Sequence, residues 1–180
     1  VHVHENHIRI EAQSLADGWV ALSQCHEHMD VVPAAEVTFN PKRIRNLRIT
    51  SAVNIGRAWV EAHTVQLEDI ETGARLCVSA ESRALLDLGQ GYYRLRNGPY
   101  MRRFLDGYFP MRVLIDVQYS AETLELVHSQ PADQPGFAVR SEPGRVRVDV
   151  SFEGRLHTCL DFRAEAADDR SLPNLPCPDD

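Results

Sequence analysis

The sequence predicts an all-β protein built as an antiparallel β-sandwich, immunoglobulin-like or similar in architecture. About ten short segments alternate apolar and polar residues, and Gly, Pro, Asn and Asp separate them. Helical periodicity is nearly absent. With 180 residues, 43% of them hydrophobic and 25% charged, the chain is long and apolar enough to bury a substantial core. We expect either one continuous sandwich or two closely packed subdomains.

The N-terminal β region, residues 1–110, contains most of the expected strands. Residues 1–11 alternate but are interrupted by polar residues near Glu5 and Asn6, which predicts an edge-like strand with a break there. Residues 75–83 alternate most clearly, with Leu76 and Val78 facing inward. The other predicted strands are 19–25, 37–39, 47–50, 59–68 and 92–96, with turns at 16–18 and 71–73.

One short helix is predicted near residues 99–106. Pro99 suits the first turn of a helix, and Gly107 suits a C-terminal stop. This is the best helix candidate in a sequence otherwise poor in them.

The C-terminal β region, residues 111–165, alternates regularly in strands at 111–119, 124–127 and 137–140. The clearest pattern is 145–152 followed by 156–162, which reads as a hairpin. A three-residue loop, 153–155, places Val148 opposite Leu160 on one apolar face, whereas a two-residue loop mixes the faces. Because this region alone has few strands, we expect it to pack with residues 1–110 as one unit.

Residues 166–180 form a tail rich in Pro, Asp and Asn, and we expect it to be irregular. The alternation turns Cys159 outward, so a Cys159–Cys177 disulfide would hold the tail across the sheet and stabilise the fold by roughly 3 kcal/mol. Cys25 and Cys77 are then the remaining pair. Two other connectivities are compatible with the sequence.

Four separated cysteines without a C-x-x-C motif indicate two disulfides and an oxidising compartment. The chain begins at Val1 without an apolar leader, as a processed exported protein would. We therefore expect a periplasmic or secreted protein.

Several function classes are disfavoured. The net charge of −7 argues against a nucleic-acid-binding protein, and no apolar run is long enough to span a membrane. The sequence has no nucleophile elbow, P-loop, dinucleotide fingerprint or H-E-x-x-H motif. We therefore expect a non-enzymatic protein without a required cofactor. The alternatives are a copper- or zinc-binding or delivery protein and an enzyme whose site matches no familiar motif.

The histidines provide one candidate site. His2 and His4 form an H-x-H pair, and His26 and His28 form another. Residues at i and i+2 of a strand project from one face, so pairing of the first two strands would bring both motifs together. Imidazoles suit copper or zinc, and Met29 favours copper. An exposed, solvated terminus is the alternative interpretation of these residues.

The stretch 89–113 provides the other candidate site, because it holds six of the thirteen aromatic residues and five arginines against one acid. Aromatic and arginine side chains are enriched at interface hot spots. We therefore expect a surface that binds a partner protein, or joins this chain to a larger assembly, formed by Tyr92, Arg94, Arg96, Tyr100, Arg102, Arg103 and Tyr108. The alternatives are a small-ligand pocket and an aromatic plug at the end of the sandwich.

Overall fold

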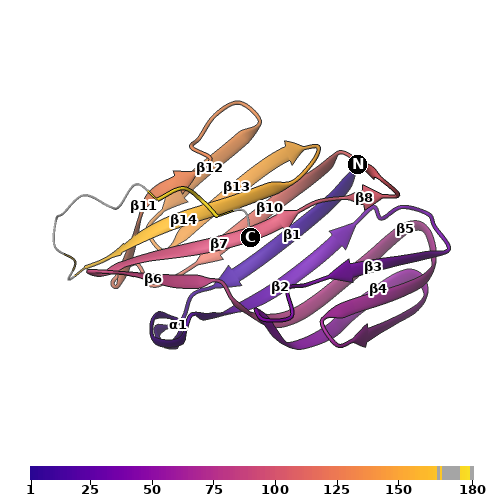
Figure 1. Cartoon of the computed structure of the whole chain (residues 1–180), viewed down its shortest axis with the longest axis horizontal. Helices are drawn as coiled ribbons and strands as arrows, with labels where there is room; N and C mark the ends of the chain where they lie inside the picture. The colour runs from indigo at the N-terminus through magenta and orange to yellow at the C-terminus, as the bar shows by residue number, and fades with distance from the viewer. Residues whose placement is uncertain (166, 168–174, 179–180) are drawn as a thin grey trace.

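The computed structural model describes residues 1–165, 167 and 175–178 and consists almost entirely of β-strands (Figure 1). Two sheets face each other, and a small two-stranded hairpin lies beside them. Sheet A, the larger, is formed by β1 (His2–Arg9), β2 (Trp19–Glu27), β3 (Ala34–Thr38), β4 (Ile44–Glu61), β5 (Thr64–Arg83), β10 (Met111–Gln118), β12 (Phe137–Glu142) and β13 (Arg145–Phe152). The predicted all-β, sandwich-like fold is confirmed.

Sheet B has four strands, β6 (Leu85–Gly89), β7 (Tyr92–Tyr100), β11 (Leu124–Gln130) and β14 (Leu156–Ala164), in the order β11-β14-β7-β6. The hairpin pairs β8 (Arg103–Phe104) with β9 (Gly107–Tyr108). Sheet A runs β12-β13-β10-β1-β2-β5-β3, and β4 lies along the other edge of β5. Both sheets therefore contain strands from 1–110 and from 111–165, which lie as two adjoining blocks within each sheet.

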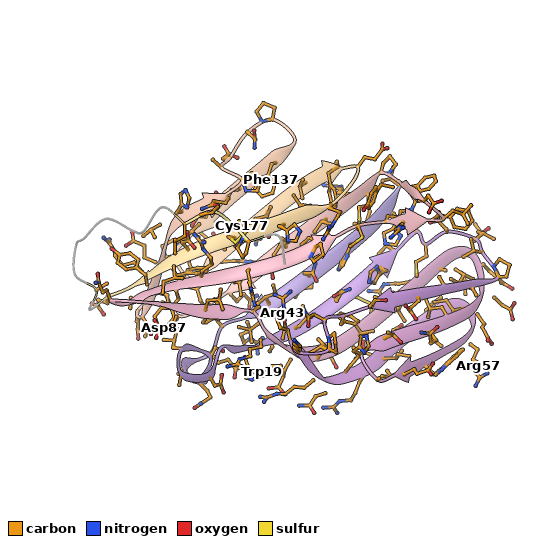
Figure 2. The ribbon with its side chains drawn as sticks, in the orientation of Figure 1. Trp19, Arg43, Arg57, Asp87, Phe137 and Cys177 are labelled. Carbon is orange, nitrogen blue, oxygen red and sulfur yellow. A yellow bond between two sulfur atoms is a disulfide. The ribbon has the colours of Figure 1, made fainter. Side chains whose placement is uncertain are left out.

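The main core lies between the two sheets. Its buried side chains come from alternate positions of facing strands, among them Val113, Ile115 and Val148 of sheet A and Leu95 and Phe162 of sheet B. A second cluster, including Val65, Leu67 and Leu76, lies where sheet A extends past sheet B through β3, β4 and β5. In Figure 2, Phe137 marks the main core between the two sheets, and Arg57 marks the far end of the part of sheet A that extends past sheet B. Sheet A is thus covered over only part of its inner face.

The short helix of the described residues is α1 (Ala12–Asp17), not a helix near 99–106. It begins with a reciprocal cap in which the Glu11 backbone N–H donates to Ser14 Oγ over 3.0 Å. It ends at Gly18, whose positive φ of 80° allows its N–H to reach the Ser14 carbonyl. A Cβ at Gly18 would lie 2.7 Å from the Leu85 carbonyl, so a larger residue does not fit there.

The helix predicted near 99–106 was wrong because packing onto sheet B overrides the local proline signal. Residues 99–100 complete β7, where Tyr100 pairs with Leu156 and buries its ring. The chain then reverses between β8 and β9, and Leu105 supplies the left-handed turn conformation with φ 52°. Gly107 is consequently a strand residue rather than a helix stop.

The predicted hairpin of 145–152 with 156–162 is also wrong, although both segments are strands. β13 pairs with β10 and β12, whereas β14 pairs with β7 and β11 in the opposite sheet. Val148 and Leu160 do share the main core, but they meet across the sandwich. Alternation shows which residues face the core and does not show which strand lies alongside.

Two further predictions about β4 and β5 need correction. The expected strand at 59–68 is divided by a turn at Ala62–His63, and Ala62 there has φ 54°. The expected turn at 71–73 is a bulge inside β5, because Val53 pairs with Arg75 while Ile55 pairs with Ile70. Leu76 and Val78 face inward as predicted.

Both disulfides join the cysteine pairs that the sequence favoured. Cys25 and Cys77 are directly opposite each other on β2 and β5. Cys159 is joined to Cys177, which lies against the outer face of sheet B (Figure 2). Most of the predicted irregular tail, 166–180, falls outside the described residues. No helix in the described ranges is long and apolar enough to cross a membrane.

Candidate functional site

A row of polar side chains occupies the inner face of sheet A at the end that sheet B leaves uncovered. β1 and β2 pair antiparallel, which places His4 opposite His26. His4, Asn6 and His26 are buried, and β1 runs without the predicted break near Asn6. Asn6 keeps to the buried face because its amide bonds both His4 and the Tyr100 hydroxyl.

We call His2, His4, Asn6, Gln24 and His26 the histidine cluster. Gln24 Nε2 donates to His26 Nε2 over 2.7 Å, and His26 Nδ1 lies 3.1 Å from His2 Nε2. The His4 ring is 4.3 Å from the His26 ring, centroid to centroid. The two H-x-H motifs therefore converge in part, because the His26 imidazole contacts those of both His2 and His4.

The three imidazoles of the cluster are neutral at neutral pH. Burial, reinforced by the nearby Arg102 guanidinium, lowers the pKa of His2 to about 4. Burial next to His2 lowers the pKa of His4 to about 4 as well. Burial and the two neighbouring imidazoles hold the pKa of His26 well below its ordinary value. Each neutral ring therefore keeps one nitrogen lone pair that can accept a hydrogen bond or bind a metal ion.

The cluster opens into a cavity of about 910 Å³. Its walls come from β1, β2, the β2–β3 connection, β3, the end of β7, the β8–β9 hairpin and the start of β10. All three methionines of the chain line this cavity, Met29, Met101 and Met111. Met111 is the Cα partner of His2 across the parallel β1–β10 pair. The cavity therefore combines imidazole nitrogens with thioether sulfurs.

The remaining candidate ligands lie elsewhere. His28 follows β2 and does not line the cavity. Cys25 is in a disulfide, and His7 faces Asp116 over 3.7 Å on the other face of β1. Asp30 lines the cavity, but Arg102 binds its carboxylate. Among residues 1–165, 167 and 175–178, no three His, Cys, Asp or Glu side chains are placed to hold a metal ion.

The arginine and aromatic residues predicted to form one surface are divided by the structure. Tyr92, Arg94 and Tyr100 are buried, so they cannot contact a macromolecular partner. Arg96 lies within β7, partly buried beside a second cavity. Arg103 and Tyr108 are exposed on the β8–β9 hairpin, and Arg102 lies at its base. Residues close in sequence are separated here because 92–100 form a strand inside sheet B, whereas 103–108 form a hairpin outside that sheet.

Arg94 forms a buried ion pair on the outer face of sheet B. Its Nε and Nη2 atoms donate to the two carboxylate oxygens of Asp161 over 2.7 and 3.0 Å. The same guanidinium donates to the backbone carbonyls of Leu175 and Pro176. Residues 175–178, which we call the strap, are thus attached to the sheet by Arg94, by Gln130 and by the Cys159–Cys177 disulfide.

Asp161 has a structural role that sequence reasoning missed. Leu160 and Phe162 face the core, so alternation places Asp161 outward, where a carboxylate is unremarkable. The signal was Cys159, because a tail pinned at that position must also cover Asp161, two residues along the same face. Asn6 and Gln24 were missed because neither belongs to a recognisable motif.

The β8–β9 hairpin carries an exposed apolar patch. Leu105 is 79% exposed and Phe104 is 58% exposed, and Met101, Tyr108 and Phe109 are also exposed. The Phe104 and Phe109 rings pack edge to face with centroids 6.5 Å apart. Arg102 donates to the Pro110 carbonyl over 2.9 Å, which ties the base of the hairpin. We call Met101, Arg103, Phe104, Leu105, Tyr108 and Phe109 the hairpin surface.

Comparisons with known proteins indicate a likeness of fold. No protein-family model and no curated protein matches the sequence. A mutant of the M1 zinc metallopeptidase of Deinococcus radiodurans, bound to a Tyr-Ser-Ala substrate, is similar with a TM-score of 0.50 and 12% sequence identity. The match covers 89% of this chain and 41% of that chain.

Two more structures match with the same identity and coverage. A two-domain M1 zinc metallopeptidase mutant bound to L-tryptophan has a TM-score of 0.47, and another structure of the Deinococcus radiodurans mutant has 0.46. This chain therefore spans 41% of the length of the metallopeptidase chains it matches.

Proposed function

We propose that this chain is a non-enzymatic, exported β-sandwich module that binds a partner protein through the hairpin surface. The observation that carries the proposal is the exposure of Phe104 and Leu105 at the tip of a two-stranded hairpin. An isolated hairpin is only marginally stable in water, and contiguous exposed apolar side chains mark interaction sites. A partner surface would bury them.

The chemistry of the hairpin surface indicates the kind of partner. Its centre is aromatic and aliphatic, and Arg103 and Asp106 add an exposed ion pair at the edge. The complementary surface is therefore an apolar groove with a polar rim that can pair with both charges.

The fold likeness supports a role inside a larger assembly. In the Deinococcus radiodurans metallopeptidase the similar region is 41% of a longer chain, so a β-sandwich of this shape stands there beside additional protein. A peptidase-like catalytic domain, in the same chain or in a separate one, is therefore the first partner to test. The two disulfides support the exported location.

The test begins with the partner identified by mass spectrometry from the protein's own host and continues with the purified pair. The dissociation constant is measured by calorimetry for the wild type and for a Phe104→Ser, Leu105→Ser variant. We expect at least tenfold weaker binding, because hot-spot side chains each contribute about 2 kcal/mol or more. The Arg102→Ala, Arg103→Ala variant should also bind more weakly.

A matched control removes exposed apolar side chains elsewhere. Val53 on β4 and Val127 on β11 are exposed at a distance from the hairpin. A Val53→Ser, Val127→Ser variant should bind the partner within twofold of the wild type. Equal binding by the hairpin variant and the wild type would rule out the hairpin surface as the docking site.

A further inference from the structure

The cavity above the histidine cluster collects the donor atoms of a soft metal site. His2 and His26 contribute neutral imidazoles, and the three methionines of the chain contribute thioethers from the walls. Imidazole suits copper and zinc, whereas thioether sulfur selects Cu(I). A purely structural apolar cavity would have no need to gather all of the methionines around two buried histidines and the half-buried His2.

The spacing of two nitrogens matches a shared ion. His2 Nε2 and His26 Nδ1 are 3.1 Å apart. Two nitrogens that each lie about 2.0–2.1 Å from a tetrahedrally coordinated ion are themselves about 3.3 Å apart. An ion can therefore take the place of the hydrogen between these two atoms without separating them, and both rings turn so that their lone pairs converge on it.

Gln24 can hold His26 in the tautomer that metal binding needs. In the metal-free arrangement Gln24 Nε2 donates to His26 Nε2, so the ring hydrogen is on Nδ1. If the Gln24 amide turns over, its carbonyl oxygen accepts from His26 Nε2–H and the Nδ1 lone pair becomes available. The ring hydrogen moves from Nδ1 to Nε2, and no proton leaves the site. Such partners orient metal-binding histidines.

We propose that the cavity binds one Cu(I) ion through His2 Nε2, His26 Nδ1 and the thioethers of Met111 and Met29. Met111 is placed beside His2 by the β1–β10 register, and Met29 follows the end of β2 beyond His26. His4 packs on the His26 ring and limits its rotation.

Hard cations and zinc fit this cavity less well than Cu(I). Arg102 binds the carboxylate of Asp30, which is one of two acidic side chains in the lining, and the other, Glu36, bonds Gln66 and Thr38. The described residues supply no closed group of three His, Cys, Asp or Glu ligands. Structural zinc takes four such ligands, and calcium takes six or more oxygens.

The experiment is an anaerobic titration of the full chain with Cu(I) against bicinchoninate as a competing chelator. The wild type should bind one Cu(I) per chain, and X-ray absorption should show nitrogen and sulfur in the first coordination shell. The His2→Gln, His26→Gln variant should bind Cu(I) at least tenfold more weakly. Absence of a bound equivalent in the wild type, or a shell without sulfur, would overturn the proposal.

A second variant keeps the test decisive where the histidine substitutions disturb folding. Met29→Leu with Met111→Leu preserves side-chain volume and removes both sulfurs, and such exchanges are well tolerated in cores. It should lose at least tenfold in Cu(I) affinity. The matched control is His63→Gln, in the β4–β5 turn and outside the cavity, which should leave affinity unchanged. Equal losses in the control and the Met variant, or a Zn(II) affinity above that for Cu(I), would refute the assignment. This proposal does not depend on partner binding.

Discussion

Two groups of polar side chains, the strap side of sheet B and the histidine cluster of sheet A, are built in opposite ways. On sheet B, Arg94 and Asp161 are charged, 3% and 0% exposed at their side chains, and covered by the disulfide-anchored strap. On sheet A, three imidazoles are neutral and open into a cavity. The first group is closed and fully paired, and the second keeps donor atoms facing open space.

This difference separates a structural role from a binding role. A buried ion pair with its remaining hydrogen bonds satisfied by backbone carbonyls has no capacity left for a ligand. Neutral imidazoles that bond one another keep nitrogen atoms that a bound metal ion could use instead, which is the basis of the Cu(I) proposal. Burial of a polar residue is therefore not enough to identify a binding site. The deciding question is whether a ligand can replace the hydrogen-bond partners of that residue.

The largest expected effect comes from breaking the ion pair on sheet B. Asp161→Ala leaves the Arg94 guanidinium buried without its carboxylate and should cost about 3–5 kcal/mol in the free energy of unfolding. Chemical denaturation followed by circular dichroism measures it. The control is Asp149→Ala, which removes the exposed carboxylate bound by Arg112 and should cost about 1 kcal/mol or less. Similar losses in the two variants would show that the strap side is not a closed structural centre.

A smaller effect is expected when the histidine cluster of the metal-free protein is acidified. The pKa of His4 is about 4 in the folded protein and near 6.5 in the unfolded chain, so the unfolded chain takes up the proton first as pH falls. The contribution of neutral His4 to the free energy of unfolding is therefore fully present above about pH 6.5 and is lost progressively as the pH falls toward 4. His4 alone should account for about 2 kcal/mol between pH 7 and pH 5.

The charged and titratable groups outside the cluster that act on it are Arg102, Asp30, His28, the N-terminal amine and Tyr100. Arg102 lowers the pKa of Asp30, and burial raises that of Tyr100, so neither group changes charge between pH 7 and pH 5. Urea unfolding at several pH values measures the decline. A His63→Gln variant should follow the wild type, whereas equal stability at pH 7 and pH 5 would show that the cluster is accessible to water.

The sequence predicted the inner faces of strands well and their neighbours poorly. Leu76, Val78, Val148 and Leu160 all face the core as their alternation indicates. Pairing was not predictable for β13 and β14, because two strands that present apolar faces can satisfy the same pattern side by side or across a sandwich. Long-range packing chose the second arrangement.

The candidate sites could be predicted only where the spacing of residues along a strand indicates which side chains meet. The H-x-H motifs indicated that His2, His4 and His26 would meet, since i and i+2 residues share a strand face. Met29 was a candidate because it follows His28 directly, but the place of Met111 could not be inferred, because it depends on β10 lying parallel to β1. Arg94 looked like a surface residue because its carboxylate partner is 67 positions away and its cover is the tail.

The smallest expected effect concerns the bond that joins the histidine cluster to sheet B. Asn6 Nδ2 donates to the Tyr100 hydroxyl over 3.3 Å, and both groups are neutral and buried. Tyr100→Phe leaves that donor without its acceptor, which should cost about 1 kcal/mol in the free energy of unfolding. Tyr108→Phe on the exposed hairpin is the control and should change stability by less than about 0.5 kcal/mol. A Tyr100→Phe loss of stability as large as that of Asp161→Ala would mean that the histidine cluster, like the strap side, is a centre of stability. A loss near 1 kcal/mol keeps the two regions distinct, because the neutral hydrogen bonds of the cluster are then weak enough to be exchanged for bonds to a ligand.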